Sequence, residues 1–164
     1  YSLEREWRGT HDPKNWNWFG ARDGAGRDLG EPKSVLFIML NPSTADGAQD
    51  DPTIRRCVGF AKSWNYEALT VVNLFALRAT KPSELFKAGG DVYGSRNQEV
   101  IETAAARAGL IIAAWGAHGG WGGQDETVRG WLNEYPVYVL GSTKEGHPRH
   151  PLYLPATSKP IIWA

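Results

Sequence analysis

Four largely apolar runs recur along the chain, and each lacks the strict polar alternation of a half-exposed strand. They cover residues 35–40, 69–76, 110–114 and 137–140. Runs of this length that lack alternation are typical of strands covered on both faces of a sheet. The pattern therefore predicts four buried strands.

Helices are predicted between these strands. Asp51 can cap a helix that begins at Pro52, and apolar side chains then recur at three- and four-residue spacing until Asn65. A short helix is expected near 81–85, an alanine-rich helix over 95–108, and another over 126–133. Ser95 and Asn97 are interpreted as helix caps.

Strands that alternate with helices predict an α/β fold, a three-layer α/β/α arrangement around a central four-stranded parallel sheet. We expect one domain over 1–164, with an aromatic-rich, hairpin-like cover at 1–34, a core at 35–153 and a tail at 154–164 that packs back on the core. The tryptophans of the cover are interpreted as plugs of the sheet end.

Charge and cysteine content narrow the functional classes. Eighteen basic and eighteen acidic residues give a net charge of zero, so nucleic-acid binding would need a local basic patch. A single cysteine, Cys57, excludes an internal disulfide and a one-chain cysteine-ligated iron–sulfur cluster. The lone cysteine makes a reducing cytoplasm the expected location. No apolar run approaches membrane-spanning length and the first residues do not resemble a signal peptide, so no membrane partner is expected. We also expect a monomer.

Unusual polar residues follow each predicted strand. Asn41, Asn73, Trp115 and either His147 or His150 lie at or beyond successive strand ends. In an open α/β sheet these carboxyl ends share the edge at which ligands bind. Carboxamides can read the edge of a planar heterocycle, an aromatic ring can stack on its face, and a histidine can stabilise an oxyanion. Phosphate-loop, Rossmann, serine-elbow and zinc-protease motifs do not occur.

The order of these motifs resembles the uracil-DNA glycosylase superfamily, most closely its mismatch-specific uracil/thymine branch. The segments that carry the resemblance are Met39–Ser43, Pro52–Arg56, Val71–Ala79, Ile111–Gly116 and His147–Leu152. Met39 stands where the family has a glycine. The chain also resembles a bacterial and phage family of unknown function, number 1643, through MLNPSTAD at 39–46 and PRHPLY at 148–153.

The resemblance implies a role for each strand end in base excision, a DNA-repair reaction on a flipped base. Asn41 would hold the attacking water, Asn73 would read the base, and a histidine would stabilise the departing base anion. The implied catalytic residues are Asn41, His147 and His150. The implied substrate-binding residues are Pro42, Ser43, Asn73, Phe75, Trp115 and Gly116. The implied nucleic-acid contacts are Arg55, Arg78, Lys144, Arg149, Leu152 and Tyr153.

Simpler roles compete with these. Asn41 can cap a turn, Trp115 can plug the sheet end, and the two histidines cannot be separated by sequence, although motif phase favours His147. Asp46, Asp50 and Asp51 are interpreted as caps and solvated charges, not as a metal site, and no cofactor is expected.

The resulting expectation is a DNA glycosylase-like hydrolase that acts on a mismatched or modified base. It would be slow, because the asparagine at the water site cannot take a proton. The alternatives are a catalytically silent module that binds nucleotides or nucleic acid, and a glycosidase that acts on free nucleosides or nucleotides.

Overall fold

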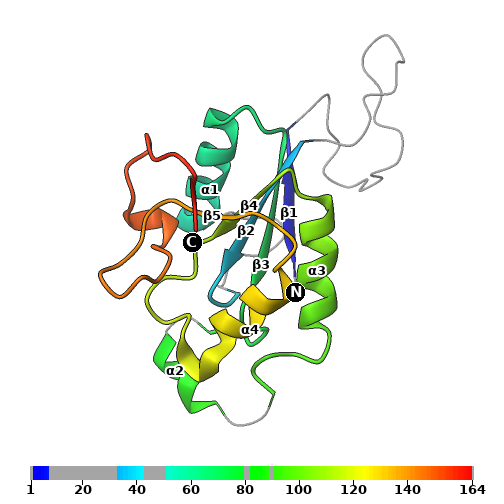
Figure 1. Cartoon of the computed structure of the whole chain (residues 1–164), viewed down its shortest axis with the longest axis vertical. Coiled ribbons are helices and arrows are strands. Elements are labelled where there is room, and N and C mark those ends of the chain that lie inside the picture. Colours follow the sequence, from blue (N-terminus) through cyan, green and yellow to red (C-terminus); the bar gives the residue numbers. More distant parts are fainter. Residues whose placement is uncertain (1, 8–32, 43–50, 80–81, 89–90, 164) are drawn as a thin grey trace.

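The computed structural model describes residues 2–7, 33–42, 51–79, 82–88 and 91–163. Figure 1 shows a central sheet with helices packed on it. The strands are β1 (Leu3–Glu6), β2 (Ser34–Met39), β3 (Ala68–Asn73), β4 (Leu110–Ala113), β5 (Val137–Val139) and β6 (Ile161–Ile162). The helices are α1 (Pro52–Ser63), α2 (Pro82–Lys87), α3 (Asn97–Arg107) and α4 (Gln124–Trp131), with short 3-10 turns η1 (Trp121–Gly123) and η2 (Pro151–Tyr153).

The sheet is six-stranded and mixed, in the order β1-β3-β2-β4-β5-β6. The inner pairs β3–β2, β2–β4 and β4–β5 are parallel, whereas β1 pairs with β3 and β6 pairs with β5 antiparallel. The expected sheet of four parallel strands is therefore wrong as a description of the whole sheet. The edge strands have four and two residues, too short to produce a clear periodic pattern.

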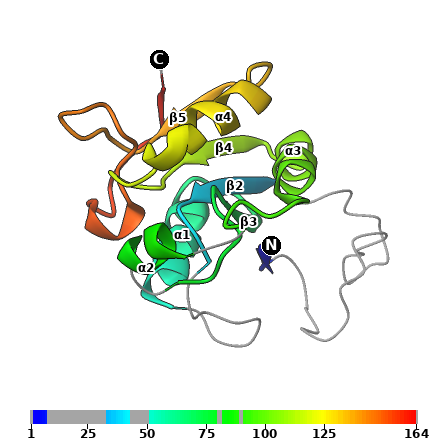
Figure 2. The same ribbon diagram turned by 90° about the horizontal axis from the view of Figure 1, so that it is seen from below.

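Two apolar clusters cover the two faces of the sheet. Val35, Phe37 and Met39 of β2 point to the α1 face, and Leu36 and Ile38 point to the face that α3 and α4 cover. Every residue of β2 is buried, because strands in this position lack a solvated face. Figure 2 shows α1 on one side of the sheet, with α3 and α4 on the other.

One of the predicted helix caps is present in the structure and another is not. The carboxylate of Asp51 accepts the Ile54 backbone N–H at 2.8 Å, so the predicted cap of α1 is confirmed. Asn97, by contrast, does not cap α3. It is 2% exposed within the first turn, and its side chain points into the core.

The chain after η2 returns to the sheet. The Trp163 backbone N–H donates to the Val137 carbonyl at 2.9 Å, and its ring meets the Trp115 ring at 5.3 Å between centroids. The expectation that the tail packs on the core is thus confirmed. Of the N-terminal aromatics, Trp7 packs beside the α1 face, while Trp16, Trp18 and Phe19 lie outside the described residues. In the described part of the chain, no helix has the length and apolar character to span a bilayer.

Candidate functional site

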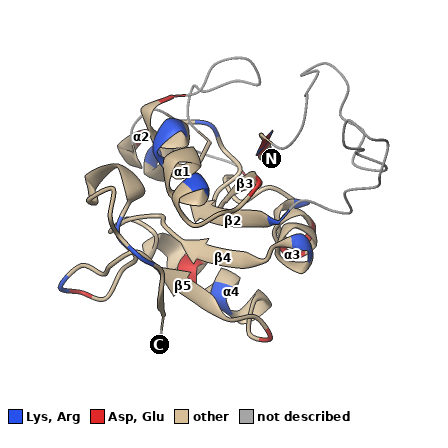
Figure 3. Cartoon of the chain, turned by 90° about the horizontal axis from the view of Figure 1, so that it is seen from above, with Lys and Arg blue, Asp and Glu red and all other residues tan. Residues whose placement is uncertain are grey.

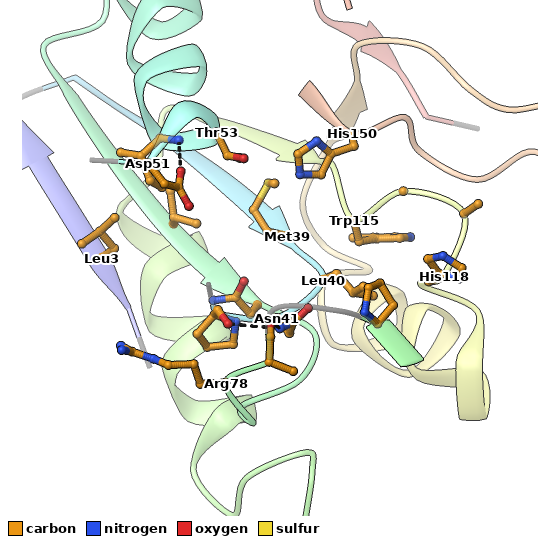
Figure 4. A pocket seen from close by; sticks show the side chains of 18 of the residues that line it. Leu3, Met39, Leu40, Asn41, Asp51, Thr53, Arg78, Trp115, His118 and His150 are labelled. Atoms are coloured by element: carbon orange, nitrogen blue, oxygen red, sulfur yellow. Dashed lines mark hydrogen bonds between the residues drawn. The ribbon is translucent and has the colours of Figure 1, made fainter. Parts of the chain in front are cut away.

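A cavity of about 940 Å³ opens at the carboxyl edge of the inner strands. Its walls come from the ends of β2, β3 and β4, the first turn of α1, and the segment that leads into η2. Figure 4 shows these walls, with Asp51 and Thr53 at the start of α1 and Trp115 and His150 on the opposite side of Met39. Its volume is within the range typical of small-molecule and cofactor pockets.

Asn73 provides the cavity with a buried carboxamide. It is the last residue of β3, stands beside Met39 in the parallel register, and is 8% exposed. Among the described residues, its side-chain amide has no hydrogen-bond partner. Neither amide atom is among the buried polar atoms that lack a partner, so the amide is open to the cavity, where water or a ligand can complete its hydrogen bonds.

Asn41 joins the loops that follow β2 and β3. Its Nδ2 donates to the Ala79 carbonyl at 2.7 Å and to the Pro42 carbonyl at 3.0 Å. The Ala79 backbone N–H in turn donates to Pro42. Because both bonds use the nitrogen, the amide has a fixed orientation. Its Oδ1, which accepts no hydrogen bond from the described residues, can accept one from water or ligand.

The structure separates the two histidines that the sequence left unresolved. His150 lines the cavity and His147 does not. Nδ1 of His147 lies 3.7 Å from a carboxylate oxygen of Asp125, a side chain near the start of α4. The preference for His147 from motif phase therefore selected the histidine that does not line the cavity.

His150 has a defined tautomer. Its Nδ1 accepts the Leu152 backbone N–H at 3.3 Å, so the proton of the neutral ring is on Nε2. Burial lowers the pKa of His150 below its ordinary value, and the negative charge of Asp51 offsets part of that shift. At neutral pH the cavity thus contains a neutral imidazole whose remaining N–H is a hydrogen-bond donor.

Trp115 is both a wall of the cavity and part of the core. It is 3% exposed, its ring lies edge-to-face with Trp163, and its buried Nε1 has no hydrogen-bond partner. The following Gly116 also lines the cavity and has a φ of 78°, a conformation that favours glycine. The Trp115 side chain therefore both packs in the core at the end of the sheet and forms a wall of the cavity.

The other predicted contacts divide into three groups. Pro42, Arg78, Arg149 and Tyr153 line the cavity with Asn41 and Asn73. Arg55, Lys144 and Leu152 are exposed residues that do not line it, and Figure 3 shows Lys and Arg spread over several elements. Ser43 lies outside the described residues.

Phe75, predicted to bind substrate, does not line the cavity. It is fully buried on the α3 and α4 face, where its ring contacts Tyr93 and Trp121 at 5.6 and 5.4 Å between centroids. Its position two residues beyond the end of β3 puts it in the loop after the sheet edge, where it packs among aromatic side chains.

Sequence reasoning missed Asp51, Thr53 and His118 as cavity residues. The helix after a parallel strand begins at that strand's carboxyl edge, so the cap of α1 was bound to lie near Asn41. Asp46 and Asp50 are outside the described residues. Within the described ranges, no three His, Cys, Asp or Glu side chains are grouped to hold a metal ion.

Comparison with known proteins gives one result. The family described as "Protein of unknown function (DUF1643)" matches residues 1–152. No curated protein and no solved structure matches the chain.

Proposed function

The chain belongs to the DUF1643 family, and we propose that it is an N-glycosidase that hydrolyses the bond between a mismatched or modified nucleobase and its sugar in DNA. The observation that carries this proposal is the amide of Asn73. It lies at the end of β3, opens to the cavity, and has no partner among the described residues. A carboxamide that donates and accepts at once is suited to the edge of a base.

Hydrolysis follows from the groups around Asn73. The bond between the sugar's C1′ and the base nitrogen breaks with both electrons on the base. Nε2–H of His150 faces the developing negative charge as a neutral donor, as an oxyanion-hole group does. Water held by Oδ1 of Asn41 then attacks C1′. One hydrogen of the water ends on the base and the hydroxyl on the sugar.

Kinship with the uracil-DNA glycosylase superfamily is part of this proposal. It is supported by the four inner parallel strands and by the polar residues at the ends of three of them. Arg78 and Arg149 on the rim of the cavity would contact phosphates beside a flipped nucleotide.

The test is to incubate the protein with oligonucleotides that contain uracil, thymine mismatches or 5-modified pyrimidines, as duplexes and single strands, and to measure abasic sites. We expect release of one base class, and loss of that release in Asn73→Ala with unchanged thermal stability. A folded protein that releases no base from any substrate would refute the proposal.

A binding module without turnover is the second candidate. It is favoured by Asn41, whose amide can orient a water but cannot accept its proton. Saturable binding of the same oligonucleotides without any abasic product would establish it. A panel of free nucleosides and nucleotides tests hydrolysis of small substrates in the same assay.

A further inference from the structure

The proposed reaction places positive charge on the sugar, and Asn41 cannot balance it. A sugar whose bond to the base is breaking has oxocarbenium character, which a nearby carboxylate stabilises. A carboxylate can also take the proton of the attacking water, whereas a carboxamide can do neither. The site therefore needs a negative charge from elsewhere.

Asp51 is the only carboxylate among the described residues that line the cavity. It precedes α1 and lies in the same wall as Thr53 and Ile54. Figure 4 shows Asp51 and His150 on either side of Met39, with Asn41 below them.

The capping bond fixes this carboxylate. Its Oδ1 accepts the Ile54 backbone N–H at 2.8 Å, which orients the group against the first turn of the helix. Asp51 and His150 line the same cavity, and the charge of Asp51 offsets part of the lowering of the His150 pKa by burial.

We propose that Asp51 is a catalytic residue of this site, whose negative charge stabilises the cationic sugar. The inference rests on the proposed N-glycosidase function. As the water oxygen bonds to C1′, one water hydrogen ends on the base that has left and the hydroxyl on the sugar, so the net reaction is hydrolysis.

The experiment compares two abasic analogues in duplex DNA, a pyrrolidine that carries a positive charge and a tetrahydrofuran that is neutral. We expect the unaltered protein to bind the pyrrolidine more tightly by about tenfold, the effect of one favourable ion pair. In Asp51→Asn, which retains a good helix cap, this preference should fall to near one. Base release should fall by about 10²-fold or more in the same variant.

Asp91→Asn is the matched control, because Asp91 also accepts backbone N–H groups of a turn but does not line the cavity. It should retain the preference. Equal affinity of the unaltered protein for the two analogues, or an unchanged preference in Asp51→Asn, would overturn the role of Asp51. If the protein nevertheless releases a base, the role of Asp51 is refuted but the glycosidase function is not. A preference lost in Asp51→Asn, without base release by the unaltered protein, would support the charge placement and refute the glycosidase function.

Discussion

Asn97 donates its side-chain amide to the backbone carbonyl of Asn73 at 2.9 Å, and also to that of Leu74 at 3.0 Å. Gln124 donates to the same Leu74 carbonyl at 3.1 Å. The first turns of α3 and α4 thereby hold the end of β3 by carboxamide bonds. Because the Asn73 amide lines the cavity and has no partner within the described part of the chain, these buried residues position the group that the proposed function depends on.

Replacing Asn97 with alanine should destabilise the fold and disturb the cavity together. The Asn73 carbonyl would lose the side-chain bond from Asn97, whereas Leu74 would keep Gln124. We expect a loss of about 1–3 kcal/mol in the free energy of unfolding, measured by chemical denaturation. The neighbouring Gln98 is exposed and pairs with Glu102, so Gln98→Ala should change stability by less than about 0.5 kcal/mol. Equal effects of the two variants would contradict the positioning role.

Much of this fold follows from hydrophobic pattern. The run at 35–40 and the Asp51–Pro52 start of α1 correspond to β2 and to a capped helix, within one or two residues. Buried strands and helix caps depend on local residue types, so a single sequence reveals them. Asn97 was different, since its polar type suggested a cap and only the tertiary structure brings it to the carbonyl of Asn73.

The two histidines show the same limit at the site. Between Gly141 and His150 the chain reverses, with Ser142 bridged to Pro148 and a turn that closes from Gly146 to Thr143. Such a reversal determines which way each side chain faces, and it is not encoded in the spacing of motifs. His147 therefore reaches Asp125, while His150 reaches the cavity.

The close packing of Gly119 against Trp115 gives a second prediction. A Cβ at residue 119 would lie 1.9 Å from Cδ1 of the buried indole, so Gly119→Ala must displace the ring. We expect a loss of about 1–3 kcal/mol of stability, with weaker ligand binding because the same ring lines the cavity. In Gly59→Ala, on an open side of α1, the new Cβ meets nothing within 4 Å. This control should gain about 0.5–1 kcal/mol, and denaturation of both variants checks the contrast. A neutral Gly119→Ala would contradict the packing.

His150 should make the fold sensitive to acid. Its folded pKa lies below the ordinary value of 6.5, so the unfolded chain binds the proton first as pH falls. Stability from His150 is therefore complete above that value and declines as pH drops below it. His150→Asn keeps a side-chain acceptor for the Leu152 N–H without a titrating group. Between pH 7.5 and 5, the free energy of unfolding should fall more in the unaltered protein than in His150→Asn. A constant difference would contradict the direction of the pKa shift.

The two histidines should also differ in catalysis. Of His147 and His150, only His150 lines the cavity, and its Nε2–H is a neutral donor for a departing base. We expect His150→Gln to lower base release by about 10²-fold or more, as removal of one oxyanion donor does. His147→Gln removes only the pairing with Asp125, which is outside the cavity, and should leave base release close to that of the unaltered protein. Single-turnover rates of both variants on the best substrate make the comparison, with circular dichroism as the check on folding. The opposite ranking, with His147 the more sensitive, would mean that the base leaves toward α4 and not toward η2.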